Sequence, residues 1–341
     1  MLLLCAPLPR SRRVPSFKTR ICVPAGIMEI TPNMGFGKSP MLRLLYEYSD
    51  RWTLLPPAST GRVETPSESE SPGMISSIRR TAVGRSMKAL LLQMADAVQH
   101  AVEAMEGDPA EVVGRGADGA PSARIDRTAE QAVLRVLEYE GASLNVLSEE
   151  AGYLDRGGKA TLVLDPIDGT HNALRGFPAY SVSMAIGHER LSDVQEALVR
   201  DLVSGATYYA AKGGGAWLNA RPIHVHPRNP ADLMFTVYLG SHAAPEAAKV
   251  TGRARRVRSL GAASLDLCLV ARGAADLYYM HSSVPEAKLR AVDIAGATLI
   301  VREAGGLVLD LEGRDLDIPL TSTSRTDLVA VGDRQTWEAI R

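Results

Sequence analysis

A short apolar run that ends in two carboxylates constrains this chain more than any other feature of its sequence. In the segment TLVLDPIDGT, residues 161–170, the apolar side chains predict a buried strand, and Asp165 and Asp168 follow it at once. Two carboxylates this close together in a buried place repel each other unless protons or cations lie between them. Pro166 fixes its backbone φ angle and stiffens the turn that directs both side chains. The fold must therefore bury this strand and hold two acidic groups at its end.

The ligand chemistry of this segment favours magnesium. Carboxylate oxygens suit Mg²⁺, whereas zinc is typically bound by His and Cys. Gly169 and Thr170 supply backbone N–H groups at a predicted helix start, a common seat for phosphate. An EF-hand loop fails because its twelfth position, which needs Glu, is Gly176. A haloacid-dehalogenase-type phosphatase fails because its second Asp comes two residues after the first, not three. On this segment alone, two carboxylates that cap a turn remain an open alternative.

Carboxylates at two other predicted element ends strengthen the metal interpretation. Glu149 follows a predicted strand at residues 144–147, and Asp293 opens a predicted helix at residues 293–304. Taken alone, Glu149 is also explained by a solvated loop and Asp293 by a helix N-cap. Together with Asp165 and Asp168, they provide four carboxylates for two or three metal ions.

The remaining pattern predicts stacked layers of helices and sheets. Apolar residues at helical spacing predict a helix over residues 87–105, and a loop rich in Gly, Asp and Pro follows it. Asp126 is expected to be the N-cap of a second amphipathic helix. Further strands are predicted at 144–147, 161–164, in several runs between 180 and 225, and at 233–239, 276–280 and 307–309, with helices at 262–271 and 293–304. Helices that alternate with sheets in this way imply stacked layers rather than a doubly wound sheet.

Residues 1–86 differ from the rest of the chain in composition. They carry 12 Lys or Arg against 6 Asp or Glu, whereas residues 87–341 carry 26 against 33. Scattered Pro, Arg and Ser without a sustained period cannot bury enough apolar area to offset the chain entropy. We expect a disordered N-terminal extension, or a spurious one with Met87 as the start; a targeting or RNA-binding arm is the other interpretation. Residues 87–341 are expected to form the folded domain.

The overall composition argues against several classes of protein. The formal net charge of −1 gives no reason to expect nucleic acid or an acidic membrane as a partner. No apolar run approaches the roughly 18 to 20 residues that span a bilayer. The three cysteines, Cys5, Cys22 and Cys268, show neither zinc-site spacing nor a disulfide framework. We therefore expect a cytoplasmic protein.

Four stretches of the sequence together resemble the inositol monophosphatase family. They are SEE at 148–150, DPIDGT at 165–170, AKGGGAWLN at 211–219, and VDIAGA at 292–297 with EAGG at 303–306. The resemblance covers about residues 87–335, and DPIDGT is highly specific. Residues 116–119 with Ile125 and Asp126 look like the loop and helix start of the archaeal-type branch, which includes fructose-1,6-bisphosphatases. The resemblance implies an α/β (α+β) fold, a layered αβαβα sandwich of the sugar-phosphatase type.

The resemblance also implies a metal centre with two to three Mg²⁺ ions. By similarity, Glu149, Asp165 and the backbone carbonyl of Ile167 hold the first ion. Asp165, Asp168 and Asp293 hold the second, with Asp165 bridging the two, and a weaker third ion lies near Glu149. Such a centre neutralises the charge of a phosphate monoester and lowers the pKa of the attacking water.

The implied activity is the hydrolysis of small sugar phosphate monoesters, inositol 1-phosphate or fructose 1,6-bisphosphate, by direct attack of water. Glu149 and Thr170 are the expected catalytic residues, and the amides of Gly169 and Thr170 are expected to bind the phosphate. The turn RSLGAAS at 258–264 looks like the one that contacts the sugar ring. The expected substrate contacts are Arg256, Arg258, Gly261, Ala262, Ala263 and Arg290.

Two features leave the substrate open. Val292 stands where many inositol phosphatases have Trp, and residues 281–288 form a longer insertion than expected, so the family's acidic sugar contact is either missing or supplied by Glu286. A 3′-phosphatase acting on adenosine 3′,5′-bisphosphate and a catalytically weak regulatory member of the family are the alternatives. A homodimer is the habit of the family.

Overall fold

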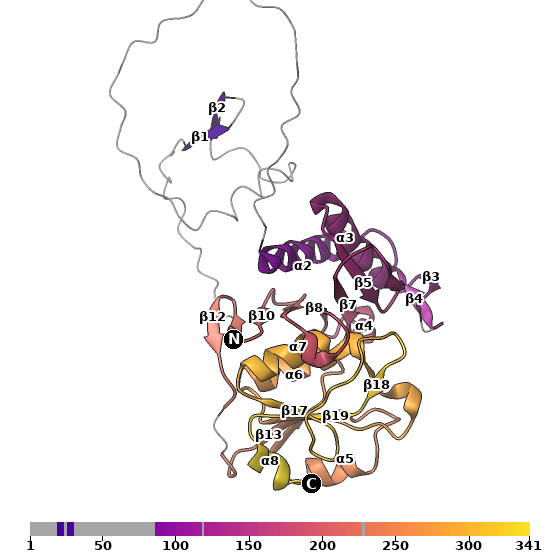
Figure 1. Cartoon of the computed structure of the whole chain (residues 1–341), viewed down its shortest axis with the longest axis vertical. Helices are drawn as coiled ribbons and strands as arrows, with labels where there is room; N and C mark the ends of the chain where they lie inside the picture. Colours follow the sequence, from indigo (N-terminus) through magenta and orange to yellow (C-terminus); the bar gives the residue numbers. More distant parts are fainter. Residues whose placement is uncertain (1–18, 24–25, 31–85, 118, 227–228) are drawn as a thin grey trace, which may run out of the picture. The chain divides into compact units, whose positions relative to one another are not determined.

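The computed structural model describes residues 19–23, 26–30, 86–117, 119–226 and 229–341 (Figure 1). The chain divides into two compact units, Met1–Ile78 and Arg79–Arg341. In the first unit, strands β1 (Thr19–Val23) and β2 (Gly26–Ile30) pair antiparallel, which the sequence did not predict. The other residues before 86 lie outside the described part, so the N-terminal extension stays a prediction.

The larger sheet of the second unit has eight strands in the order β12-β11-β10-β9-β8-β7-β5-β6. At its centre, β7 (Ala160–Asp168) runs parallel to β5 (Leu144–Ser148) and antiparallel to β8 (Ser181–Gly187). The apolar side chains of β5, β7 and β8 are buried because helices cover both faces of this part of the sheet. The other strands are β6 (Gly152–Leu154), β9 (Glu196–Asp201), β10 (Thr207–Ala211), β11 (Gly215–Leu218) and β12 (Arg221–Ile223).

The smaller sheet has five strands in the order β14-β13-β15-β19-β17. It mixes parallel and antiparallel pairs: β15 is parallel to β13 and antiparallel to β19. Its strands are β13 (Met234–Val237), β14 (Arg256–Arg258), β15 (Leu277–Met280), β17 (Leu307–Leu309) and β19 (Leu328–Val331). The predicted strands at 233–239, 276–280 and 307–309 are therefore confirmed, with ends that differ by at most two residues.

Helices form three layers around the two sheets. Helices α2 (Met87–Glu103) and α3 (Arg124–Glu140) share one apolar core with the outer face of the larger sheet. Helices α6 (Ala263–Ala271) and α7 (Ala291–Glu303) are packed in the core between the sheets. Helices α5 (Glu246–Thr251) and α8 (Arg334–Glu338) close the outer face of the smaller sheet. The order α, β, α, β, α, visible from α2 and α3 down to α5 and α8 in Figure 1, confirms the predicted sandwich.

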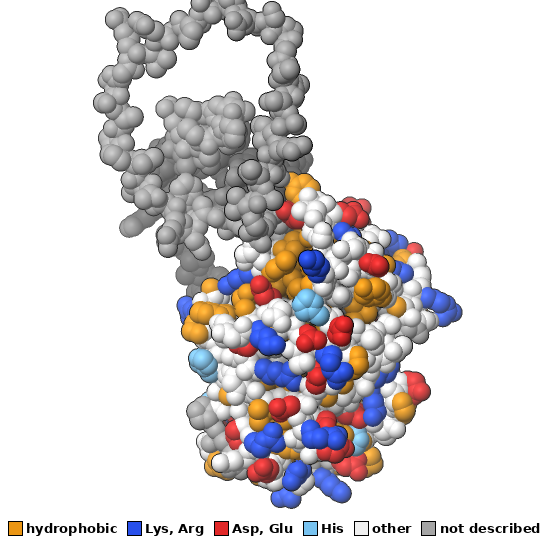
Figure 2. All heavy atoms as spheres, viewed as in Figure 1, with side chains coloured by type: hydrophobic (Ala, Val, Ile, Leu, Met, Phe, Trp, Pro, Cys, Tyr) orange, Lys and Arg blue, Asp and Glu red, His pale blue; other side chains and the backbone are white. Residues whose placement is uncertain are grey.

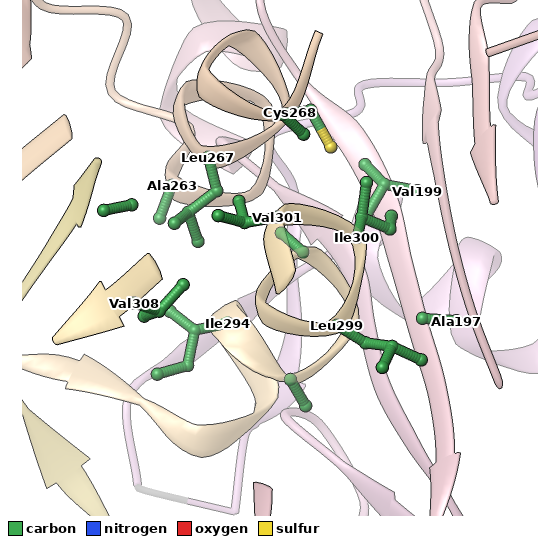
Figure 3. Packing of buried hydrophobic residues seen from close by; sticks show 14 of the residues in the cluster. Ala197, Val199, Ala263, Leu267, Cys268, Ile294, Leu299, Ile300, Val301 and Val308 are labelled. Carbon is green, nitrogen blue, oxygen red and sulfur yellow. The ribbon is translucent and has the colours of Figure 1, made fainter. Parts of the chain in front are cut away.

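The middle helical layer is apolar on almost all sides, as its position requires. Every residue of α7 from Ala291 to Val301 is buried. Figure 3 shows Ile300 on the side of Val199 of β9, and Ile294 on the side of Val308 of β17. At Gly296 a Cβ atom would lie 2.9 Å from the carbonyl oxygen of Met184, so only glycine lets α7 approach β8 this closely. This close packing holds α7 against β8.

Short elements complete the unit. The predicted loop at 107–125 contains a hairpin of β3 (Val112–Arg115) and β4 (Pro121–Ala123). Strands β16 (Leu289–Arg290) and β18 (Arg325–Thr326) form a second small pair. The remaining elements are α4 (Thr170–Arg175), η1 (Leu191–Asp193) and η2 (Pro285–Ala287). Within the described residues, no helix is long and apolar enough to cross a membrane.

One predicted helix start was wrong. Helix α3 begins at Arg124 with Ala123 as its N-cap, so Asp126 lies inside the first turn instead of capping it. Its side chain is buried and accepts a hydrogen bond from the Thr170 hydroxyl. The tertiary contact, rather than the free backbone N–H groups of the helix, decides where this carboxylate points.

Candidate active site

Three carboxylates from distant parts of the sequence meet at one end of the larger sheet. Glu149 follows β5, Asp165 lies near the end of β7, and Asp293 lies in the first turn of α7. One oxygen atom of each lies within 4.8 Å of the corresponding atoms of the other two. Carboxylates gathered this closely are the arrangement that divalent cations bind.

Asp165 is the member of this cluster that most needs a cation. Its side chain is 1% exposed, and its Oδ1 atom has no hydrogen-bond partner among the described residues. Burial, followed by the charges of Glu149, Asp168 and Asp293, raises the pKa of Asp165 well above its usual range. A buried carboxylate without donors is stable only when it takes up a proton or a positive ion.

Glu149 and Asp293 share one partner, the guanidinium of Arg290. The Nη1 atom of Arg290 donates to Glu149 Oε1 at 2.5 Å, and its Nη2 lies 2.8 Å from Asp293 Oδ1. The Nε of Arg290 donates to Asp293 Oδ1 at 3.0 Å, and the backbone N–H of Arg290 donates to Oδ2 at 2.8 Å. Burial raises the pKa of Glu149, while the charge of Arg290 lowers it. The sequence predicted Arg290 as an anion contact, and in the structure its anions are these two carboxylates.

Asp168, the fourth predicted carboxylate, faces the first turn of α6. Its Oδ1 accepts from the amide of Ala263 at 3.1 Å, and its Oδ2 accepts from the amide of Ser264 at 2.7 Å and from the Ser264 hydroxyl at 2.5 Å. Burial raises the pKa of Asp168 to about 7, although the hydrogen bonds from Ser264 oppose that rise. Asp168 is therefore buried like Asp165 but supplied with donors.

A bulge in β7 explains how the DPID segment directs Asp165 toward the acidic cluster and Asp168 toward the first turn of α6. Asp165 pairs with Ser183 of β8 and Asp168 pairs with Ser181, so β7 spends one more residue than β8 over this stretch. Side chains alternate along a strand, so residues three apart would face opposite sides of a regular strand. The extra residue re-aims the later side chain, and Pro166, which has no N–H group to pair, is compatible with a bulge.

Thr170 follows the bulge and links it to α3. Gly169 adopts a φ of +88°, and a Cβ there would lie 2.9 Å from the carbonyl oxygen of Ala179, so the tight turn requires glycine. The Thr170 hydroxyl lies 2.7 Å from Asp126 Oδ1 and 2.9 Å from the carbonyl oxygen of Ile167. Burial raises the pKa of Asp126 to about 7, while the hydrogen bond from Thr170 opposes the shift. This role of Asp126 was not predicted, because its position in the sequence indicated a helix cap.

The clustered carboxylates, Asp168 and Thr170 line a cavity of about 400 Å³. The sequence-predicted residues on its wall are Glu149, Asp165, Ile167, Asp168, Gly169, Thr170, Gly261, Ala262, Ala263, Arg290 and Asp293. Arg256 and Arg258 are not among the lining residues: Arg256 pairs with Asp232, and Arg258 donates to the carbonyl of Val257. On the face in Figure 2, acidic and basic side chains are interspersed.

Two basic residues on the cavity wall were not predicted. Lys288, at the end of the insertion 281–288, pairs with Asp327 at 2.7 Å. Arg325 of β18 lies opposite Arg290 of β16 in the strand pair and also lines the cavity. The unusual length of the insertion was the available signal for Lys288. Arg325 stands in no recognisable motif, so only the β16–β18 pairing could reveal it. Glu286, proposed as a sugar contact, lines the same wall.

Comparison with known proteins gives a consistent result. The model of the inositol monophosphatase family matches residues 84–339. The fructose-1,6-bisphosphatase/inositol-1-monophosphatase of Methanothermobacter thermautotrophicus is 34% identical over 268 residues, which cover 74% of this chain and 94% of that protein. The bifunctional NADP phosphatase/NAD kinase of Methanococcus maripaludis is 31% identical, over 71% of this chain and 46% of that protein.

Solved structures agree with the fold. The crystal structure of an inositol monophosphatase–fructose 1,6-bisphosphatase superposes with a TM-score of 0.66 at 28% identity, covering 75% of this chain and 98% of the other. A Pyrococcus horikoshii protein described as similar to inositol-1 monophosphatase superposes with a TM-score of 0.64 at 28% identity, covering 74% and 96%.

Proposed function

The chain belongs to the inositol monophosphatase family, and on that premise we propose that its cavity hydrolyses small sugar phosphate monoesters, inositol 1-phosphate or fructose 1,6-bisphosphate, with Mg²⁺. The protein is a phosphoric monoester hydrolase. One observation carries the proposal: the buried Asp165 oxygen without a donor lies in a cluster with Glu149 and Asp293, on the wall of a cavity. A strand end that is built this way is costly to the fold unless a proton or a cation binds there.

The donor set fits magnesium. The cluster offers carboxylate oxygens from Glu149, Asp165 and Asp293, and hard oxygen ligands suit Mg²⁺. Asp168 and the carbonyl of Ile167 are the further proposed ligands, since a carboxylate or carbonyl oxygen that accepts one hydrogen bond keeps a second lone pair. When bound, two to three Mg²⁺ ions supply positive charge for the phosphoryl oxygens and lower the pKa of the attacking water.

The protein's own groups orient and deprotonate the water. The Thr170 hydroxyl donates its single proton to Asp126 or to the Ile167 carbonyl, so its lone pairs are left to accept a hydrogen bond from water. Asp126, with a pKa of about 7, is matched to receive a proton near neutral pH. Glu149 is the second candidate base, and the amides of Gly169 and Thr170 are the proposed phosphate donors.

The basic wall supports a bisphosphate as one of the substrates. Lys288 and Arg325 line the same cavity as the acidic cluster, so a second phosphate has cationic partners there. On the same wall, Gly261, Ala262 and Ala263 leave room for a sugar ring, and Glu286 offers an acceptor for its hydroxyl groups. Arg256 and Arg258, which the sequence predicted as substrate contacts, do not line this cavity, so we assign the second phosphate to Lys288 and Arg325.

Phosphate release from a panel of substrates tests the proposal. The panel contains inositol 1-phosphate, fructose 1,6-bisphosphate, fructose 6-phosphate, adenosine 3′,5′-bisphosphate and NADP, each with Mg²⁺ and with a chelator. We expect Mg²⁺-dependent release from one or both of the first two, and Asp315→Asn, a change at an exposed carboxylate, should leave it intact. Release only from the nucleotides would replace the substrate class. No release from any substrate with excess Mg²⁺ would favour the catalytically weak regulatory alternative.

Assembly as a homodimer and a cytoplasmic location complete the proposal. Both are supported by the resemblance to the family. Sedimentation of the purified chain at micromolar concentration tests the first: a mass of one protomer would contradict it.

A further inference from the structure

Arg290 holds two of the three clustered carboxylates at once. Its Nη1 reaches Glu149 Oε1 at 2.5 Å, while its Nε and Nη2 reach Asp293 Oδ1 at 3.0 and 2.8 Å. Glu149 and Asp293 are 144 positions apart in the chain, and one guanidinium joins them. A planar group with several fixed donors is suited to bridge two carboxylates in this way.

The backbone fixes the direction of this side chain. Arg290 ends β16, which is paired with β18, and serves as the N-cap of α7, three residues before Asp293. The contact with Asp293 is therefore local and doubled, because the backbone N–H of Arg290 also donates to Asp293 Oδ2. The contact with Glu149 is the opposite: one donor reaches across the site to the more exposed partner, whose side chain is 23% exposed against 10% for Asp293.

The Arg290 guanidinium and a divalent cation would both bind the negatively charged carboxylate of Glu149. The Glu149 oxygen that lies in the cluster with Asp165 and Asp293 belongs to a carboxylate already bonded to Arg290. Burial opposes the positive charge of Arg290, but Asp293 and Glu149 outweigh it and raise the pKa of this side chain. Arg290 thus stays charged under all ordinary conditions and cannot leave the site by losing a proton.

We propose that Arg290 is an exchangeable counter-ion of the metal site: it competes with the divalent cation for Glu149, and it keeps Asp293 in place throughout. With a cation bound to Glu149, the Nη1 group of Arg290 would lose this acceptor and would be free to donate to the phosphoryl oxygens of the substrate. Arg290 is in this sense a positioning residue that weakens metal binding and couples it to anion binding. The inference rests on the proposed metal site but not on any particular substrate.

Calorimetric titration of the full chain with Mg²⁺, without substrate, tests the competition. We expect Arg290→Gln to bind Mg²⁺ about tenfold or more tightly than the wild type, because the competing cation is gone. Arg325→Gln is the matched control: it removes the same charge from the same cavity wall, where Arg325 donates to the carbonyl of Lys288, and so reports the general field effect. Arg290→Lys, which keeps the charge but loses the fork, should fall between the wild type and Arg290→Gln.

A second measurement distinguishes an Arg290 that competes with Mg²⁺ for Glu149 from an Arg290 that only holds the metal ligands in position. Thermal unfolding in chelator should show Arg290→Gln melting below the wild type, since the clustered carboxylates then repel each other, and added Mg²⁺ should close that gap. If Arg290→Gln binds Mg²⁺ more weakly than the wild type, or no more tightly than Arg325→Gln, the exchange is refuted and Arg290 merely orients a ligand. Phosphate release by the wild type is scored separately, so a failure of the proposed activity leaves this titration readable.

Discussion

Asp165 and Asp168 lie on the same strand, three residues apart, and are treated oppositely by the fold. Both are buried, and burial raises the pKa of each. Asp168 is bonded to two amides and a hydroxyl at the start of α6, whereas Asp165 has an oxygen without any donor among the described residues and acidic neighbours instead. Spacing identified both residues, but the donors around each one decide which carboxylate depends on a cation. The contrast teaches that a buried carboxylate oxygen without a hydrogen-bond donor indicates a metal site better than a cluster of acidic residues does.

The largest effect is expected from replacing Asp165, the carboxylate with an oxygen that lacks a donor. Asp165→Asn should lower phosphate release on the order of a thousandfold or more, because it removes the charge that unites the proposed metal ligands. In chelator, however, the same variant should melt at a higher temperature than the wild type, since it removes a buried acid whose ionised form is disfavoured by burial and by its acidic neighbours. Activity assays and thermal scans on one preparation check both.

Asp168→Asn supplies the matched comparison. It should also lose activity, but in chelator it should melt at a lower temperature than the wild type. An amide NH₂ at this position would face the N–H donors of Ala263 or Ser264, and a buried donor left unpaired costs about 1–3 kcal/mol. Shifts of the same sign in the two variants would show that the donors of α6 do not distinguish the two carboxylates.

The sequence predicted much of this arrangement because local patterns carry it. The strand at 161–164, the layered order and the four carboxylates at element ends all follow from periodicity and from motifs a few residues long. The bulge within β7 was not predicted, since it depends on the register against Ser181 and Ser183 of β8. Nothing in the local pattern says that one Asp of the pair receives three donors and the other lacks one.

Contacts between distant residues account for the other misses. Thr170 and Asp126 are 44 residues apart, and Arg290 and Glu149 are 141 apart. Helix-capping rules placed Asp126 at a helix end because they consider only the neighbouring backbone. The packing of α3 against the end of β7 overrides that preference, since a buried carboxylate needs the donor that Thr170 provides.

An effect of intermediate size is expected for the pH dependence of stability, to which Asp168 and Asp165 both contribute. The folded-state pKa of Asp168 is about 7, above its ordinary value near 4, so the folded chain holds this proton more tightly than the unfolded chain. Its stabilising contribution is complete below about pH 4 and is lost as the pH rises through about 7. Asp126 behaves in the same way. The pKa of Asp165 is also raised well above its usual range, so its contribution is likewise lost as the pH rises.

Thermal scans in chelator from pH 5 to pH 9 test these directions. The wild type should melt at progressively lower temperature as the pH rises, by several degrees in total. Asp168→Asn should flatten the slope around pH 7, and Asp165→Asn should also make the decline shallower. With saturating Mg²⁺ the decline should shrink or reverse, because metal binding requires the ionised carboxylates. A wild-type melting temperature that rises with pH in chelator would contradict the assigned directions.

The smallest effect is expected from removing one hydrogen-bond donor from Asp168, which makes its surroundings more like those of Asp165. Ser264 is buried, and its hydroxyl donates to Asp168 at 2.5 Å, so Ser264→Ala removes one of three donors and should cost about 1–3 kcal/mol of stability in chelator. Ser183 is the matched control: it is buried on β8 opposite Asp165, and its hydroxyl has no hydrogen-bond partner among the described residues. Ser183→Ala should therefore be neutral or stabilising. Denaturant titrations of both variants measure the difference, and equal losses of stability would mean that the hydrogen-bond donors do not distinguish Asp168 from Asp165.

If the losses differ as expected, Ser264→Ala should also gain more stability from Mg²⁺ than the wild type does. The reason is that an Asp168 that has lost a donor depends more on a cation, as Asp165 already does.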